Sequence, residues 1–389
     1  MNIPFANRIS SLPPYLFAGI DKVKNKLVEE GIDVISLGIG DPDMPTPEFI
    51  VNALIEATQR SVNHRYPSYL GMLDFRKAVA EWYERRFNVM LNPETEVIVL
   101  AGSKEGIAHV PLAFVQEGDY VIVCPPNYPV YGITSQFAGG KVYEAPLTKE
   151  NNFLPDLDAI PHDIAEKAKI FYVNYPNNPT SAMAPKEFYE KLIAFCKKHS
   201  IIIVHDSAYS EIYFSPNNKP CSILELPGAK DITIEFHSLS KTYNMTGWRI
   251  GMAVGNAHLI EGLAKVKENI DSGVFQAIQE AGIVGIRTGD SFCDTLRTIY
   301  KERRDMVVEI LQNIGISFDI PEATFYIWGH VPQGYTSAQY VTTVLEKTGV
   351  VLTPGSGFGS AGEGYFRISL TIGEDRLREA MDRIATLEL

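Results

Sequence analysis

The sequence predicts an α/β protein in which a mostly parallel sheet lies between helices and a small α+β unit follows it. Between about residues 97 and 255, apolar runs of strand length alternate with helical periodicity. Runs of this kind are typical of parallel strands that are buried on both faces. After about residue 290, a long helix leads into shorter strands and helices. A chain of 389 residues is long enough for about two or three domains with a large core.

The composition argues against several classes of protein and site. The hydrophobic share of 45% and the charged share of 21% are ordinary for a soluble globular chain. A net charge of −12 without clusters of Lys and Arg argues against a nucleic-acid partner. The four cysteines are scattered and the eight histidines lack metal-ligand spacing, so we expect reduced thiols, no metal site and a cytoplasmic protein. We expect neither a signal peptide nor a membrane-spanning helix.

Two candidate loops lie before the sheet region. In Gly38-Ile39-Gly40-Asp41-Pro42 the glycines allow the backbone to approach a ligand closely, although an ordinary turn has the same composition. The second loop is aromatic and begins at Tyr66. The elements expected around these loops are a Pro-rich arm, helices at 16–30, 47–60 and 73–87, and a strand at 34–37.

The apolar runs of the sheet region each end abruptly in polar or glycine residues. The runs are 97–100, 120–123, 170–173, 201–204, 232–236 and 250–254, and the residues after them include Gly102-Ser103-Lys104, Asn127-Tyr128, 174–180, 206–209 and 238–241. In parallel sheets, ligands bind outside the carboxyl ends of the strands. We therefore expect these polar residues to converge on one site. The C-terminal elements expected are helices at 266–289, 291–314 and 337–347 and strands at 316–320, 325–328, 350–353 and 365–370.

Residues 238–251 carry the most informative chemistry. The stretch supplies Ser238, Ser240, Lys241 and Arg249 directly after an apolar run. A lysine becomes a nucleophile toward carbonyl groups when a dry pocket lowers its pKa, and hydroxyls with a guanidinium suit a phosphate. This is the pattern expected of a lysine that holds pyridoxal phosphate as a Schiff base. The alternative is an ordinary surface turn with the same residue types.

Asp206 and Tyr209 follow a run that should be a central strand. A buried carboxylate is costly unless it is paired, so Asp206 is either a helix cap or a partner that keeps a pyridine nitrogen protonated. Protonation makes the ring an electron sink for a carbanion. Tyr209 either packs in the core or reaches the phenolic oxygen of the same ring.

The remaining candidates each have a structural alternative. Asn178 is either a turn residue or an amide donor to the phenolic oxygen, and Tyr128 either packs between prolines or stacks on the ring. Ser103 either caps a helix or contributes to a helix N-terminus that binds phosphate. Arg367, between apolar neighbours, either forms a structural salt bridge or binds a carboxylate.

Taken in order, the motifs resemble the fold-type I, class I and II aminotransferases over residues 5–389. The matching segments are Gly38 to Asp43, Tyr66 with Gly71, Gly102-Ser103-Lys104, Pro126 to Pro129, Asn174 to Thr180, Asp206 to Tyr209, Ser238 to Lys241, Gly247-Trp248-Arg249 and Arg367. The resemblance implies a seven-stranded, mostly parallel sheet. It also implies three segments: an N-terminal arm with part of the small domain (1–48), a large domain that binds pyridoxal phosphate (49–285) and a small C-terminal domain (286–389).

The resemblance also implies a role for each candidate. Lys241 would hold the cofactor and move protons, while Asp206 and Tyr209 would contact its ring. The other residues implied to bind the cofactor are Ser103, Lys104, Tyr128, Asn178, Ser238, Ser240, Arg249 and, in a homodimer, Tyr66 of the neighbouring subunit. Those implied to bind the amino and 2-oxo acid substrates are Gly40, Lys104, Tyr128, Asn178, Arg367 and Tyr15.

Segments 66–72, 102–109 and 269–276 resemble a bacterial branch of this family, the LL-diaminopimelate aminotransferases of lysine biosynthesis. Tyr69 departs from another branch, which has Glu at that position, whereas Lys104 matches a lysine on the substrate side. An alanine or aspartate aminotransferase and a lyase or decarboxylase on the same fold are the alternatives. A transcription regulator is a third class, and the acidic chain without a basic helix-turn-helix argues against it.

Overall fold

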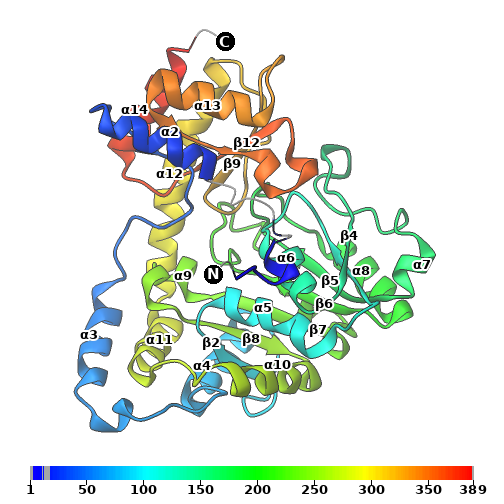
Figure 1. Cartoon of the computed structure of the whole chain (residues 1–389). Coiled ribbons are helices and arrows are strands. Elements are labelled where there is room, and N and C mark those ends of the chain that lie inside the picture. Colours follow the sequence, from blue (N-terminus) through cyan, green and yellow to red (C-terminus); the bar gives the residue numbers. More distant parts are fainter. Residues whose placement is uncertain (1–2, 11, 13–17, 388–389) are drawn as a thin grey trace.

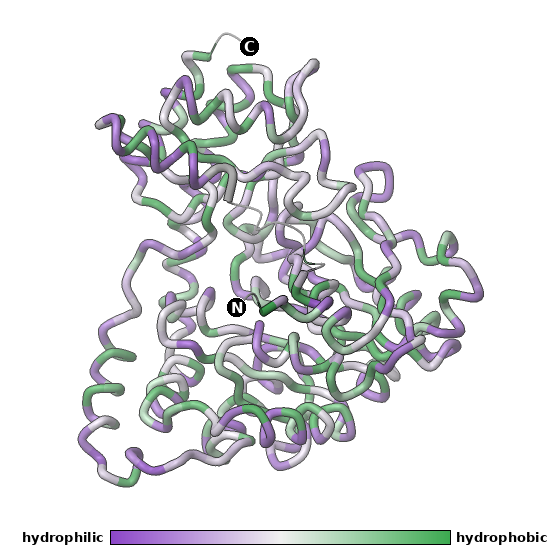
Figure 2. The backbone as a smooth tube through the Cα atoms, in the orientation of Figure 1, coloured by the Kyte–Doolittle hydropathy of each residue, from purple (hydrophilic) through white to green (hydrophobic). Residues whose placement is uncertain are grey.

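The computed structural model describes residues 3–10, 12 and 18–387, and Figure 1 shows a large lower part built around one sheet and a smaller upper part. Helix α12 (Asp290–Asn313) extends from the large part to the small one (Figure 1). No helix in the described ranges is long and apolar enough to cross a membrane. In Figure 2, hydrophilic and hydrophobic residues alternate around α3 (Glu48–Thr58), as expected of a helix with one face against the protein.

The central sheet has seven strands in the order β2-β8-β7-β6-β5-β3-β4, which confirms the predicted fold class. Their bounds are β2 Val97–Leu100, β3 Tyr120–Val123, β4 Lys141–Glu144, β5 Ala168–Asn174, β6 Ile202–Asp206, β7 Thr233–Ser238 and β8 Gly251–Gly255. In this sheet β8 runs antiparallel to the other six strands. A parallel return usually runs through a full crossover helix, and the link from β7 to β8 contains only α9 (Leu239–Thr242) and one short 3₁₀ turn.

Helices cover both faces of this sheet, as the continuous apolar runs predicted. One core cluster joins Ile203 of β6 to α4 (Leu73–Phe87), α8 (Lys186–His199) and α11 (Gln276–Thr288). A second joins the next residue, Val204, to helices on the opposite face. Those helices are α5 (Ser103–Phe114), α6 (Val130–Phe137) and α10 (Ala257–Ile270).

The smaller part has its own sheets and a third core cluster. Strands β11 (Thr353–Pro354), β12 (Tyr365–Ser369) and β9 (Tyr326–His330) form an antiparallel sheet in that order, and β1 (Ile35–Ser36) pairs in parallel with β10 (Val350–Val351). The helices here are α2 (Ala18–Glu29), α13 (Ser337–Thr348) and α14 (Glu374–Ala385), and the short helices elsewhere are α1 (Asn7–Ser10) and α7 (His162–Ala165). The pairing of β1 with β10 supports our proposal that residues 1–48 and 286–389 share the small domain.

One predicted strand is wrong. Residues 316–320 do not form a strand, because the segment pairs with β9 only through an isolated bridge between Phe318 and Gly329. Gly315 precedes it with a φ of 76° and Pro321 follows it, and both residues interrupt an extended ladder. The sequence analysis also missed β4, whose residues are only partly buried, and the C-terminal helix α14.

Candidate active site

The carboxyl ends of three neighbouring strands bring the first candidates together, as predicted. Strands β5, β6 and β7 are parallel, and in the register Asn174 lies beside Asp206 at the end of β6. Strand β7 ends at Ser238, and α9 with Lys241 follows at once. The Ser238 hydroxyl accepts a hydrogen bond from the Ser240 backbone N–H at 3.2 Å and so caps this short helix.

The side chain of Lys241 is half-buried between the loop at Gly40 and Phe325. Its Nζ donates a hydrogen bond to the Gly40 carbonyl at 2.9 Å and lies 5.7 Å from the centre of the Phe325 ring. Burial lowers the pKa of Lys241 to about 8, although the Asp41 carboxylate raises it in part. A fraction of this amine is therefore unprotonated near neutral pH, as a lysine nucleophile requires.

Asp206 is buried with one carboxylate oxygen unpaired. Its Oδ2 accepts a hydrogen bond from the Tyr131 hydroxyl at 2.8 Å, while its buried Oδ1 has no hydrogen-bond partner among the described residues. Burial raises the pKa of Asp206, and the hydrogen bond from Tyr131 opposes this rise. An unpaired buried oxygen of this kind needs a donor, which a protonated ring nitrogen supplies.

Arg367 extends from β12 in the small part to the same site. Its Nη1 donates to Asn178 Oδ1 and its Nη2 to the Gly38 carbonyl, both at 2.7 Å, and its buried Nε has no partner among the residues described. The guanidinium stacks 4.2 Å from the centre of the Tyr326 ring. Because no carboxylate of the described chain pairs with Arg367, the salt-bridge alternative loses its support, and the group is free to bind an anionic ligand.

Tyr326 on β9 fixes two other candidates. Its hydroxyl lies 3.1 Å from that of Tyr209, and the pKa of Tyr209 is raised well above its ordinary value by burial. A Cβ atom added to Gly40 would lie only 1.9 Å from the Tyr326 hydroxyl, so position 40 has no room for a side chain. Glycine is required there by close approach.

The N-terminus of α5 and Arg249 form the anionic-ligand side of the site. Gly102, with a φ of 83°, precedes α5, and a Cβ added to it would lie 2.1 Å from Arg249 Nη2. Arg249 also donates to the Thr246 carbonyl at 2.8 Å. Ser103 is the first residue of α5, and the Nζ of Lys104 lies 5.5 Å from the centre of the Tyr128 ring. A helix N-terminus beside an exposed guanidinium suits a phosphate.

Two candidates lie outside this group. The side chain of Tyr66 is 89% exposed, and Tyr15 lies outside the described residues. Conversely, three residues that contact Asp206, Tyr209 and Lys241 were not predicted from the sequence: Tyr131, Tyr326 and Phe325. Tyr131 follows Tyr128 by three residues, which is helical spacing, and that signal alone could have found it.

Comparison with known proteins shows to which family the chain belongs. The sequence profile of aminotransferases of class I and II matches residues 32–384. The chain belongs to this family. An LL-diaminopimelate aminotransferase of Nitratidesulfovibrio vulgaris strain Miyazaki F is 66% identical over 383 residues, which are 98% of each chain. One of Aquifex aeolicus is 58% identical over 385 residues, or 99% of each chain.

Solved structures agree with this aminotransferase assignment. The apo-BacF structure from Bacillus subtilis has a TM-score of 0.95 at 38% identity, covering 100% of this chain and 99% of that one. A mutant aspartate aminotransferase of Thermus thermophilus has a TM-score of 0.92 at 29% identity and 99% coverage of both chains.

Aminotransferases of this family depend on pyridoxal phosphate, and the residues present fit that cofactor. The unpaired Asp206 Oδ1 suits the pyridinium nitrogen, and the amine of Lys241 suits the aldehyde. The N-terminus of α5 with Arg249 suits the phosphate.

Proposed function

We propose that this aminotransferase acts on LL-diaminopimelate with 2-oxoglutarate as the amino acceptor, a reaction of lysine biosynthesis. The observation that carries the proposal is the identity of 52–66%, over 97–99% of each chain, to relatives named LL-diaminopimelate aminotransferase. An aspartate or alanine aminotransferase shares the cofactor residues and remains the second candidate, since a Thermus thermophilus aspartate aminotransferase has the same fold.

Pyridoxal phosphate would be held on every side by residues already described. Lys241 would bind its aldehyde, Asp206 its ring nitrogen, and Tyr209 with Asn178 its phenolic oxygen. Tyr128 would stack on the ring. The phosphate would lie among Ser103, Lys104, Ser238, Ser240 and Arg249. When bound, the protonated ring takes up the electron pair that is left as the substrate loses its Cα proton.

Arg367 would bind the α-carboxylate that is common to all amino donors. Asn178 already accepts a hydrogen bond from this guanidinium, and the loop carbonyl of Gly38 anchors its other side. The bare backbone at Gly40 lets the Tyr326 hydroxyl approach the loop closely, beside Arg367. Lys104 near Tyr128 would face a distal carboxylate. A role for Tyr15 stays a prediction.

Lys241 would move the proton. Because burial lowers its pKa to about 8, the amine can accept the Cα proton, hold it as an ammonium and return it to a neighbouring carbon. Its hydrogen bond to the Gly40 carbonyl holds Nζ on the substrate-loop side of the site. Phe325 and the other buried aromatic groups exclude water from this transfer.

We also propose a homodimer in which Tyr66 completes the phosphate site of the partner. The exposed side chain of Tyr66 lies in a region with other exposed apolar residues, namely Val62, Tyr69, Ile270 and Phe275. Gln276 bonds to the Val62 carbonyl, so the two segments lie side by side. A cytoplasmic location is part of the same proposal and is supported by the four free cysteines, three of which are buried.

The test is a single-turnover experiment on purified holoenzyme without keto acid. LL-diaminopimelate, glutamate, aspartate and alanine are added separately, and conversion of the cofactor to its amine form is followed by absorbance. Rapid conversion with LL-diaminopimelate and glutamate alone supports the proposal. Conversion with aspartate or alanine and not with LL-diaminopimelate would favour the second candidate. Steady release of ammonia or CO₂ without keto acid would indicate a lyase instead.

A further inference from the structure

A buried polar cluster lies directly behind Asp206, on the opposite face of the central sheet. It consists of His205 on β6, Glu235 and His237 on β7, Tyr83 on α4 and Ser222, and we name it the His205–Glu235 cluster. His205 and Glu235 face each other in the register of the two strands. Since successive residues of a strand point to opposite faces, His205 points toward α8 while Asp206 points toward α6.

Glu235 is completely buried and yet fully satisfied. Oε1 accepts from the Tyr83 and Ser222 hydroxyls, both at 2.7 Å, and lies 3.2 Å from His237 Nε2. Oε2 lies 2.7 Å from His205 Nδ1 and accepts from the Ile223 backbone N–H at 3.2 Å. Burial alone would raise the pKa of Glu235, but the hydrogen bonds from the two histidines outweigh it and hold the pKa well below its ordinary value. The carboxylate is therefore ionised.

Both ring nitrogens of His205 face oxygen atoms that can accept a hydrogen bond. Nδ1 faces the ionised Glu235 carboxylate, which can only accept. Nε2 lies 3.2 Å from the Tyr175 carbonyl, which also can only accept, and 3.2 Å from the Tyr189 hydroxyl. An imidazole that donates at both nitrogens is an imidazolium, and such a charge would lie one residue away from Asp206.

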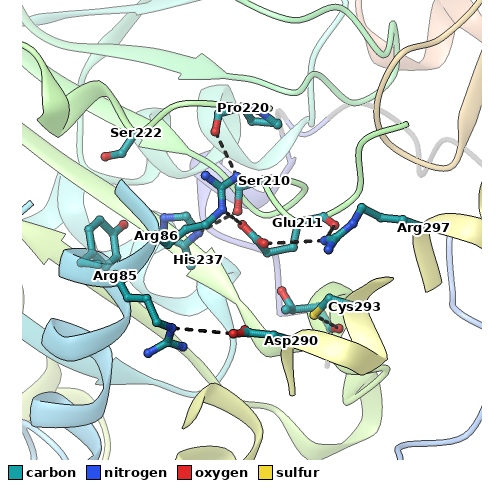
Figure 3. Close-up of polar contacts among 12 residues, drawn as sticks. Arg85, Arg86, Ser210, Glu211, Pro220, Ser222, His237, Asp290, Cys293 and Arg297 are labelled. Atoms are coloured by element: carbon teal, nitrogen blue, oxygen red, sulfur yellow. Dashed lines mark hydrogen bonds and ion pairs between the residues drawn. The ribbon is translucent and has the colours of Figure 1, made fainter. Parts of the chain in front are cut away.

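His237 connects the cluster to the other cofactor residues. Its Nδ1 lies 3.3 Å from the Ser210 hydroxyl. Glu211 is in turn held by Arg86 at 3.1 Å (Figure 3). Ser210 follows Tyr209 directly, and His237 precedes Ser238. The cluster is therefore joined to the backbone segments that carry Asp206, Tyr209 and Ser238.

We propose that His205, held as an imidazolium by Glu235, is a positioning residue that keeps Asp206 ionised against the cofactor ring nitrogen. A buried carboxylate tends to take up a proton, and a nearby positive charge opposes that tendency. Positive charges on His205 and on His237 would both lower the pKa of Asp206, against its burial. This inference rests on the proposed cofactor, but it does not depend on which amino donor is used.

The test compares holoenzymes in which His205 is neutral with a control that keeps its charge. In His205→Asn the side-chain amide replaces the ring near Nδ1, and in His205→Gln it replaces the ring near Nε2. If one variant fails to fold, the other is used. Tyr189→Phe removes only the hydroxyl at Nε2 and is the matched control. Protonation of the cofactor ring nitrogen is followed by ¹⁵N NMR of ring-labelled pyridoxal phosphate. The absorbance of the bound cofactor is titrated between pH 5 and 10. Thermal unfolding of each apoenzyme is measured in parallel.

We expect both neutral variants to lose ring-nitrogen protonation in the NMR spectrum and to raise the absorbance midpoint by about one pH unit. The kcat should fall by about tenfold while KM for the amino donor changes by less than about twofold, because Arg367 is untouched. Tyr189→Phe should lower thermal stability and leave the midpoint unchanged. Adding Glu235→Gln to His205→Asn removes the negative charge that has lost its partner. The double variant should reverse more than half of the shift in the absorbance midpoint.

Unchanged NMR and absorbance titrations in the neutral variants, with only lower thermal stability, would overturn the proposal and leave the cluster a purely structural element. An equal shift in Tyr189→Phe would also overturn it, since that variant keeps the charge. A wild-type holoenzyme without any cofactor absorbance would instead contradict the proposed cofactor, so the two failures are distinguishable.

Discussion

At the scale of single residues, the candidate site is defined by polar groups that the fold leaves incompletely paired. Asp206 Oδ1 and Arg367 Nε are buried without hydrogen-bond partners in the described part of the chain. Unpaired buried groups are costly, so their retention at the convergent strand ends indicates that a ligand completes them. Lys241 is a third buried polar group at this site. It has a hydrogen-bond partner, but burial disfavours its charged form and lowers its pKa.

Lys241→Ala should abolish transamination and the visible absorbance of the bound cofactor, because no other amine occupies that position. The fold should survive, since within the described part of the chain the removed side chain makes only one hydrogen bond, to the Gly40 carbonyl. Circular dichroism and gel filtration check the fold, and a coupled assay checks turnover. Normal transamination by this variant would contradict the assignment of Lys241.

The rate at which apoenzyme binds pyridoxal phosphate should rise with pH through a midpoint near 8, because only the free amine attacks an aldehyde. Asp41→Asn should lower this midpoint, since the Asp41 carboxylate raises the pKa of Lys241. Stopped-flow absorbance between pH 6 and 10 measures both midpoints. A midpoint for Asp41→Asn at or above that of the wild type would show that the loop carboxylate does not act on Lys241.

At the scale of elements, the site is assembled where loops of the small part meet strand ends of the large one. The loop that begins at Gly38 is held by Arg367 of β12 and by Thr353, whose hydroxyl donates to the Gly38 carbonyl at 2.8 Å. Its continuation is held by Arg303 of α12, which forms two hydrogen bonds with Asp43 at 2.7 and 2.9 Å. The position of this loop therefore depends on how β11, β12 and α12 are placed relative to one another.

Gly40→Ala tests that placement. The added methyl group would collide with the Tyr326 hydroxyl, so we expect a loss of about 1–3 kcal/mol in stability and a marked fall in kcat/KM. Gly373→Ala is the control, because nothing lies within 4 Å of its added Cβ and its φ is ordinary. Equal behaviour of the two variants in thermal unfolding and in the coupled assay would contradict the close approach at position 40.

The sequence predicted the strand ends well because local patterns encode them. Asn174, Asp206 and Ser238 each follow an apolar run, and parallel topology then forces them to one edge. Tyr131, Tyr326 and Phe325 were not predicted as site residues, because their importance depends on which helix face or distant strand packs over the site. Strand β8 was predicted from its apolar run, but its antiparallel direction was not, since such a run looks the same in either direction.

At the scale of the whole molecule, the exposed side chain of Tyr66 supports our proposal that it completes the site of a partner subunit. Its loop is tied to the α10–α11 connection, where a Cβ added to Gly273 would lie 2.8 Å from the Ser68 carbonyl. A close fit of this kind fixes the loop on the surface of its own subunit, from which Tyr66 extends outward. In the proposed homodimer, each site then needs both chains.

Mixing inactive Lys241→Ala and Tyr66→Ala subunits tests the homodimer. After subunit exchange, random pairing gives hybrid dimers with one complete site, so about a quarter of wild-type activity should return. Each variant mixed with itself is the control and should remain inactive or nearly so. Failure to recover activity despite exchange, shown by native mass spectrometry, would contradict a shared site.

The central claim is that Lys241 holds pyridoxal phosphate, and one measurement tests it most directly. Holoenzyme is reduced with borohydride, which fixes the cofactor to its lysine, and the digested protein is mapped by mass spectrometry. The account predicts that the added mass is found on the peptide containing Lys241 and on no other. The same mass on Lys104, or an unmodified Lys241 in fully yellow enzyme, would contradict the account.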